Sequence, residues 1–115
     1  MATLNKVQVI GNVTRDPEVK FTPKGGAVTE LSVAVNRSYT TDEGEKKEET
    51  TFVEFTFWGK QAEFAGEYAK KGRQVYVEGR LRLDSWEDKE TPPKKHQRLR
   101  LTGENIQLLG AKPAE

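Results

Sequence analysis

The sequence predicts an all-β domain with one short helix, and three features of its 115 residues support that prediction. Hydrophobic residues alternate with polar ones over several stretches, which is the period of half-buried strands. Turn signals separate these stretches, the clearest being Pro23-Lys24-Gly25-Gly26. One segment, around Phe64 and Tyr68, instead has apolar residues four apart, as a helix requires. At this length we expect a single core and one domain over residues 1–110, with residues 111–115 beginning a flexible tail.

The first half of the chain predicts two strands and a long connection. The first strand covers residues 6–13, and a short extended stretch covers 18–22. The second strand follows the Pro-Gly turn, and the polar, acidic run from Tyr39 to Thr51 is expected to be a long exposed loop. The inward residues of the two strands are Val7, Val9, Val13, Leu31, Val33 and Val35.

The second half predicts three further strands and the helix. A strand covers Phe52–Trp58, the helix ends before Gly72, a long strand covers Val75–Trp86, an exposed loop covers Asp88–Lys95, and the last strand begins near Gln97. Hydrophobic parity flips after Gly103, which predicts a bulge or kink there. The residues expected in the core are Val53, Phe55, Phe57, Phe64, Tyr68, Val75, Val77, Leu81, Leu83, Leu99 and Leu101.

Three strands, a helix and two more strands is the order of elements in the OB-fold. This fold is a five-stranded Greek-key barrel that often binds oligonucleotides or oligosaccharides. The predicted helix lies between the third and fourth strands, as that fold requires, and glycines within strands at Gly11 and Gly79 suit a tightly curved small barrel.

Composition excludes several classes of protein. The chain has no cysteine, so disulfides, thiolate metal sites and a cysteine nucleophile are excluded. The N-terminus lacks the pattern of a signal peptide, and no apolar run is long enough to span a bilayer, so we expect a cytoplasmic protein without a membrane partner. The net charge of +1 is weak for a nucleic-acid binder, but it is unevenly distributed, because residues 42–49 hold five acids and two lysines.

Three large aromatic residues occupy faces that should be solvated. Phe52 and Trp58 lie opposite the inward residues of their strand, and Trp86 shares the outer face of its strand with Arg80 and Arg82. Aromatic side chains interleaved with cations are typical of surfaces that bind unpaired bases, because stacking tolerates any sequence. Parity alone leaves a second reading open, in which these rings cover a small second core or a subunit interface.

The sequence offers no catalytic or metal site. His96 is the only histidine and has no second histidine or cysteine with which to bind a metal. The acids near Glu43 and Glu48 lie in a polar segment, and Gly25-Gly26 lacks the lysine and serine of a phosphate-binding loop. We therefore expect no enzyme and no cofactor.

Several short motifs together resemble the bacterial single-stranded DNA-binding proteins. They are Asn5-Lys6-Val7, Ile10-Gly11-Asn12, Asp16-Pro17-Glu18-Val19-Lys20-Phe21, Gly25-Gly26-Ala27-Val28, Trp58-Gly59-Lys60, Glu67-Tyr68, Lys71-Gly72 and Val75-Tyr76-Val77-Glu78-Gly79-Arg80-Leu81-Arg82 ahead of Trp86. The resemblance runs nearly end to end. It implies an OB-fold that usually forms a homotetramer and sequesters single-stranded DNA at the nucleoid during replication, repair and recombination.

The resemblance also implies a set of site residues. The four positions that match the family's base-stacking aromatics are Tyr39, Phe52, Trp58 and Trp86. The positions that match its phosphate-binding cations are Lys6, Lys20, Lys60, Lys71 and Arg82, and the predicted strands add Arg73 and Arg80.

The chain departs from the family pattern at three places. Tyrosine and phenylalanine stand at the first two stacking positions, where tryptophan is typical, and Asp84-Ser85 stands where basic residues are frequent. The chain also ends at Glu115, without the acidic-tipped tail that recruits partner proteins in the family. We therefore expect no tail-mediated partners for this chain.

Two alternatives belong to other functional classes. The same barrel face would serve a protein-binding module, in which case aromatic substitutions would weaken assembly and leave DNA affinity unchanged. A nuclease built on an OB barrel is the third class, and metal-dependent cleavage of single strands would identify it.

Overall fold

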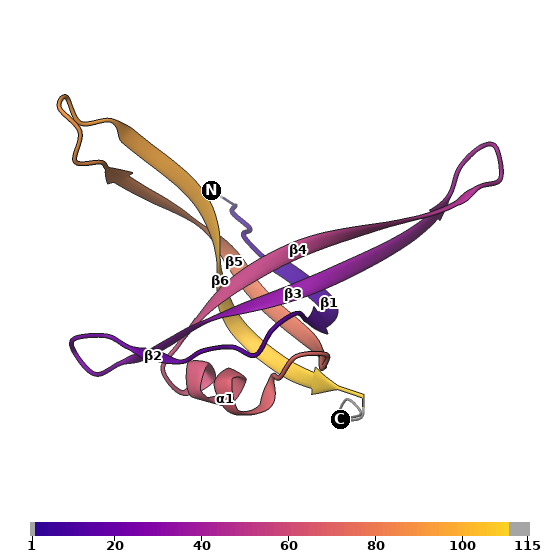
Figure 1. Ribbon diagram of the computed structural model, residues 1–115, viewed down its shortest axis with the longest axis horizontal. Helices are drawn as coiled ribbons and strands as arrows, with labels where there is room; N and C mark the ends of the chain where they lie inside the picture. The colour runs from indigo at the N-terminus through magenta and orange to yellow at the C-terminus, as the bar shows by residue number, and fades with distance from the viewer. Residues whose placement is uncertain (1, 111–115) are drawn as a thin grey trace.

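The computed structural model describes residues 2–110, and this part of the chain contains six strands and one helix. The sheet order is β1-β5-β6-β4-β3-β2, and pairing of β1 with β3 closes it into a barrel (Figure 1). This is the predicted five-stranded barrel, with the short β2 in place of the expected extended stretch. The expected tail at residues 111–115 lies outside the described residues. The elements are β1 Val7–Val13, β2 Lys20–Phe21, β3 Ala27–Thr40, β4 Lys46–Trp58, α1 Lys60–Tyr68, β5 Gln74–Glu87 and β6 Lys95–Leu109.

The core lies inside the barrel and follows the alternation of the strands. Phe55 and Phe57 of β4 are fully buried, and their rings are tilted to each other with centroids 6.5 Å apart. The strands β3 and β5 add buried side chains at every second position, because alternate residues of a strand point to the same face. The other large, fully buried side chains are Leu31, Val33, Val75 and Val77. The sequence predicted all six as core residues.

The helix covers one end of the barrel with its small residues, and here the prediction was wrong. Phe64 and Tyr68 were expected in the core, yet both are exposed and pack against each other with ring centroids 5.1 Å apart. The buried residues of this segment are Ala62, Ala65 and Ala69. Small side chains let the helix approach the strands closely, so the larger residues on the adjacent stripe remain outside.

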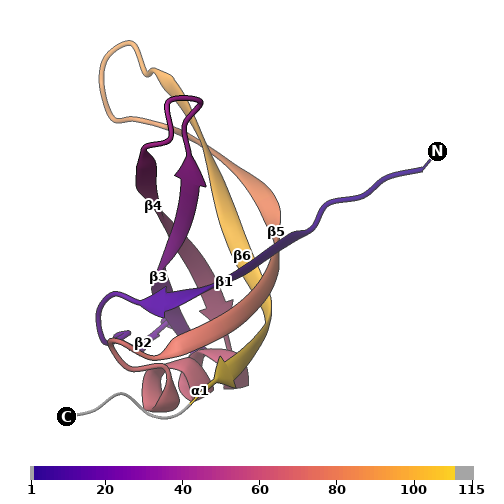
Figure 2. The ribbon, with the colours of Figure 1, turned by 90° about the vertical axis from the view of Figure 1, so that its right-hand side faces the viewer.

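Two long hairpins extend beyond the barrel and form what we call the β3–β4 arm and the β5–β6 arm. Figures 1 and 2 show both arms projecting from the barrel end opposite α1. The arms raise the radius of gyration to 17.3 Å, whereas a compact chain of about 100 residues has roughly 13 Å. The two arms therefore present much more surface than a closed barrel would.

The β3–β4 arm corrects the expected loop at Tyr39–Thr51. Strand pairing continues to Thr40↔Lys46, and only the turn at residues 41–45 is unpaired. In that turn Thr41 Oγ1 accepts a hydrogen bond from the backbone N–H of Glu45. The polar composition of this segment reflects two strands that are solvated on both faces, and not a loop.

The β5–β6 arm corrects the expected burial of its leucines. Leu81, Leu83 and Leu99 keep the predicted alternation but are exposed, because the strands have left the barrel at this point. The predicted bulge is confirmed: Glu78 pairs with Asn105 and Gly79 with Gly103, so that Glu104 is the extra residue.

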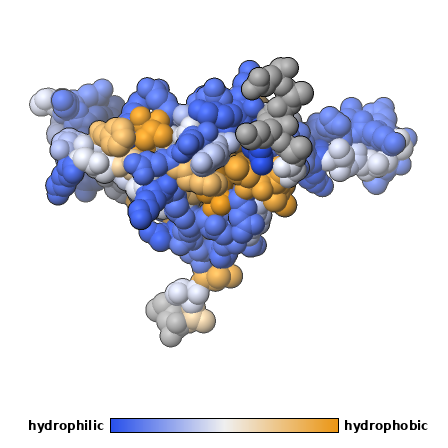
Figure 3. Space-filling view, turned by 90° about the horizontal axis from the view of Figure 1, so that it is seen from below, coloured by the Kyte–Doolittle hydropathy of each residue, from blue (hydrophilic) through white to orange (hydrophobic). Residues whose placement is uncertain are grey.

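The surface view from the side of α1 shows hydrophobic residues gathered at the middle of the molecule and hydrophilic ends at both sides (Figure 3).

Within residues 2–110, no helix is long and apolar enough to cross a membrane.

Candidate nucleic-acid interface

The outer face of β4 carries two exposed aromatic rings. Phe52 pairs across the strands with Ala34 and is 68% exposed, and Trp58 pairs with Val28 and is 46% exposed. Their strand neighbours Phe55 and Phe57 are fully buried, so the ladder itself holds Phe52 and Trp58 outward. This placement agrees with the sequence prediction.

Trp86 lies on the β5–β6 arm, where one face of its ring is already occupied. His96 is its cross-strand partner, and the two rings stack with centroids 5.5 Å apart and an interplanar angle of 22°. His96 Nε2 lies 2.8 Å from Asp88 Oδ2. Hydrogen bonds from the backbone N–H of Lys94 and from His96 hold the pKa of Asp88 below its ordinary value. His96 therefore covers one face of the indole, while the Trp86 side chain as a whole stays 46% exposed.

Tyr39 lies on the other face of the β3–β4 arm from Phe52. Tyr39 is on the same face of β3 as Val33 and Val35, whereas Phe52 pairs with Ala34, which is on the opposite face. The Arg37 guanidinium carbon lies 5.1 Å from the centre of the Tyr39 ring, within cation–π distance. A single extended ligand that contacted both the Tyr39 ring and the Phe52 ring would have to pass around the β3–β4 arm.

The predicted phosphate-binding cations fall into two groups. Lys20, Lys60 and Lys71 are exposed, and among residues 2–110 they form no ion pair. Three others are already paired: Lys6 Nζ with Glu78 Oε2 at 2.7 Å, Arg80 Nη1 with Glu104 Oε2 at 3.4 Å and Arg82 Nε with Asp84 Oδ1 at 3.0 Å. Arg73 donates to the carbonyl oxygen of Gly110 at 3.3 Å. The structure therefore leaves the three lysines freer to meet phosphate than the other four cations.

The ion pair of Lys6 belongs to a network on β1 and β5. Gln8 Nε2 donates to Tyr76 Oη at 2.8 Å, and Tyr76 Oη donates to Glu78 Oε1 at 2.6 Å. The hydrogen bond from Lys6 lowers the pKa of Glu78, and the bond from Tyr76 lowers it further. The same contacts with Glu78 raise the pKa values of Lys6 and Tyr76.

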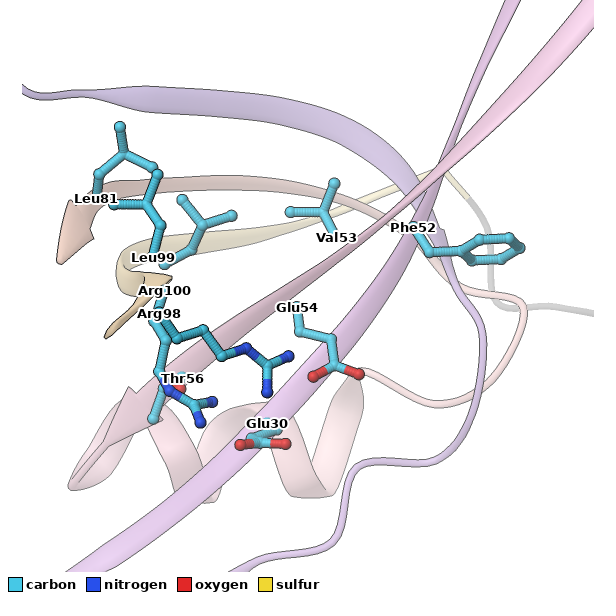
Figure 4. Close-up of a pocket in the computed structure, with 10 residues that line it drawn as sticks. Glu30, Phe52, Val53, Glu54, Thr56, Leu81, Arg98, Leu99 and Arg100 are labelled. Carbon is cyan, nitrogen blue, oxygen red and sulfur yellow. The ribbon is translucent and has the colours of Figure 1, made fainter. Parts of the chain in front are cut away.

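Two arginines that the sequence analysis missed join this surface. Arg98 and Arg100 of β6 pair with Asp84 and Arg82, so they share the face of Trp86. Arg98 and Arg100 alternate with Leu99 and Leu101, a pattern that indicates a polar outer face, but they lie outside the motifs that resemble the family. Both line a groove in the fork between the two arms, beside Phe52 (Figure 4).

The described residues contain no group of three or more histidine, aspartate or glutamate side chains placed to hold a metal ion. The geometry supports binding through rings and cations.

The fold and the site define a class: an OB-fold barrel whose outer faces and arms present aromatic rings beside cations, as in proteins that bind nucleic acid strands. A family model described as the single-strand binding protein family matches residues 4–109. The chain belongs to this family. The members of this family are non-enzymatic DNA-binding proteins. This agrees with the prediction that the chain is not an enzyme.

Individual relatives support the same assignment. A single-stranded DNA-binding protein of Helicobacter hepaticus is 39% identical over 110 residues, which are 96% of this chain and 64% of that protein. One of Wolinella succinogenes is 38% identical over 110 residues, with 96% of this chain and 67% of that protein covered. The chain thus spans about two thirds of the length of these relatives.

Solved structures match the fold. The single-stranded DNA-binding protein of Thermus aquaticus, in a deletion mutant, superposes with a TM-score of 0.81 at 31% identity, covering 95% of this chain and 52% of that one. A Plasmodium falciparum protein, solved as a complex with single-stranded DNA, superposes with a TM-score of 0.78 at 27% identity, covering 96% and 98% of the two chains. These matches confirm the OB-fold predicted from the order of elements.

Proposed function

We propose that this protein binds and protects single-stranded DNA with little regard to sequence, in replication, repair and recombination. The observation that carries the proposal is the exposure of Phe52, Trp58 and Trp86 on the outer faces of β4 and the β5–β6 arm. Bases would stack on these rings, and Tyr39 would add a fourth ring on the other side of its arm. The relative solved with single-stranded DNA supports the choice of ligand. In the cell the protein would act in the cytoplasm, at the nucleoid.

Lysines and arginines would follow the DNA backbone. Lys20, Lys60 and Lys71 are exposed, so each can meet a phosphate without first giving up an ion pair within residues 2–110. Lys6, Arg80 and Arg82 would exchange a carboxylate for a phosphate, and Arg73 would exchange a carbonyl. Release of counterions from the DNA makes such binding fall steeply with salt.

We also propose that residues 1–110 form the binding domain and assemble into homotetramers. Two surfaces support assembly. On one side, residues 7–10 of β1 pair with β5 and with no other strand among residues 2–110, so this strand edge would be available to a second copy. On the other, Leu81, Leu83 and Leu99 form an exposed apolar face on the β5–β6 arm. Light scattering at several protein concentrations would give the mass of the assembly, and a monomer at every concentration would contradict this part of the proposal.

A titration with oligo-dT tests DNA binding. The two tryptophans are both proposed to stack on bases, so binding should quench tryptophan fluorescence, and affinity should fall as salt rises. Duplex DNA of the same length, at the same salt concentration, is the control. Little quenching, or equal affinity for the duplex, would refute the proposed function.

A further inference from the structure

Three side chains at the end of the β5–β6 arm are in contact and form what we call the arm-tip cluster: Trp86, His96 and Asp88. Trp86 comes from β5, His96 from β6 and Asp88 from the loop that joins the two strands. The imidazole of His96 contacts both of the others, because it stacks on the indole and its Nε2 lies 2.8 Å from Asp88 Oδ2. His96 is therefore the link between the ring of Trp86 and the loop.

Asp88 is itself held by the backbone of that loop. Its Oδ1 accepts hydrogen bonds from the backbone N–H of Glu90 at 3.1 Å and from the backbone N–H of Lys94 at 2.9 Å. The backbone N–H of Asp88 donates to the carbonyl oxygen of Lys94 at 3.0 Å. One carboxylate oxygen thus holds the loop, and the other holds the imidazole of His96 against the indole.

The indole of Trp86 has few other restraints at this place. It is 46% exposed, and the strand ladder ends one pair further along the arm, at Glu87↔Lys95. Among residues 2–110, His96 is the only ring that stacks on Trp86. A side chain that must be immobilised when its ligand binds weakens the affinity by about two- to tenfold. A ring that is already held before the ligand arrives avoids this loss.

The charge of the arm-tip cluster depends on the protonation of His96. Hydrogen bonds from the backbone N–H of Lys94 and from His96 hold the pKa of Asp88 below its ordinary value, so this carboxylate is ionised at neutral pH. With a neutral imidazole the carboxylate is uncompensated inside the cluster and repels phosphate. An imidazolium removes that repulsion and adds a cation–π attraction to the indole.

His96 is the only histidine of the chain, and histidine is the side chain that ordinarily changes its charge between about pH 5 and 8. The other charged side chains around the cluster are Asp84 and Arg98 on the same face of the arm, Glu87 and Lys95 on the opposite face, and Lys89, Glu90 and Lys94 in the loop. Because these belong to other residue types, a change of DNA affinity near neutral pH can be traced to one side chain.

We propose that His96 is the positioning residue for base stacking on Trp86 and that its protonation strengthens the binding of DNA. The stacked imidazole restrains the indole in the free protein, so less side-chain freedom is lost when a base stacks on the exposed part of the ring. The proposal rests on the proposed function, because it requires Trp86 to meet DNA. In the opposite arrangement a base would displace His96 from the indole, and removal of His96 would then strengthen binding.

A double-mutant cycle tests the positioning. His96→Ala, Trp86→Ala and the double variant are titrated with labelled oligo-dT at pH 7.5, where histidine is ordinarily mostly neutral, and at one salt concentration. We expect His96→Ala to raise the Kd about fivefold in the wild-type background and less than about twofold in the Trp86→Ala background, because His96 acts through the indole. Gln97→Ala is the matched control, since Gln97 is the next residue of β6, is exposed and faces the other side of the arm.

The pH profile is the second readout, and a purely structural role for His96 would not produce it. Oligo-dT is the probe because neither thymine nor the phosphodiester changes its charge between pH 5.5 and 7.5. We expect the wild-type Kd to fall about threefold as the pH falls through this range, which is the size of one exposed charge contact. His96→Ala should show no such fall. His96→Phe keeps a ring against the indole and has no proton to gain, so it should restore the Kd at pH 7.5 to within about twofold of wild type without restoring the pH response.

The unfolding midpoint of each variant shows whether it is folded. The proposal would be overturned by a His96→Ala variant that binds as well as wild type or better, by equal losses in the two backgrounds, or by a pH response that is absent from wild type or survives in His96→Ala. In each of these cases the wild-type protein still binds oligo-dT, so the proposed function stands. Failure of the wild-type protein to bind oligo-dT would overturn both.

Discussion

Replacing Phe52 and Trp58 by alanine, singly and together, tests whether the outer face of β4 holds two separate bases. The two residues are six positions apart on one strand, which separates them by roughly 20 Å at about 3.4 Å per residue. Each ring is expected to contribute about 1–3 kcal/mol of stacking, so each single variant should raise the Kd about 5-fold to 150-fold. Sites this far apart are expected to be additive within about 0.5 kcal/mol, so the double variant should lose about 2–6 kcal/mol.

The assay is fluorescence anisotropy of a labelled oligo-dT long enough to span both positions, at a fixed salt concentration. Phe64→Ala is the control, because Phe64 is an exposed aromatic on α1 and has no proposed contact with DNA. Trp58 is about half buried, so the unfolding midpoint must be measured to separate loss of stability from loss of binding. A double variant that binds no worse than the weaker single variant would show that the two rings do not act on different bases.

Two further predictions concern the barrel. Gly79→Ala would place a Cβ 2.2 Å from the carbonyl oxygen of Thr102 on the paired strand. We expect this substitution to lower the free energy of unfolding, measured with denaturant, by about 1–3 kcal/mol. Gly26→Ala is the control, because its Cβ would meet nothing closer than 3.5 Å and should leave the unfolding midpoint nearly unchanged. Glu78→Gln removes the ion pair with Lys6, and because the pKa of Glu78 is held below its ordinary value of 4.5, the wild-type advantage should be complete above that pH and should shrink as the pH falls below it. Equal destabilisation by the two alanines, or an advantage that grows in acid, would contradict these expectations.

Local pattern was sufficient wherever burial follows from strand parity inside the barrel. The alternation from Phe52 to Trp58 placed Phe55 and Phe57 in the core and held the first and last rings outward, because neighbouring side chains of a strand point to opposite faces. The parity change after Gly103 likewise predicted the bulge at Glu104. Both are properties of one strand and its backbone, so they can be recognised without knowing what lies opposite.

The sequence by itself determined the order of elements, the barrel strands and the outward aromatic rings. Only the tertiary structure decided where the barrel ends, and therefore that Leu81 and Leu83 are exposed although their alternation is unbroken. It also decided which stripe of α1 is buried, since the close approach of the helix selects alanine over Phe64. The groove between the arms brings β4 and β6 together through parallel pairing of residues far apart in the chain. Proximity of this kind depends on the closed sheet, and no local period of the sequence encodes it.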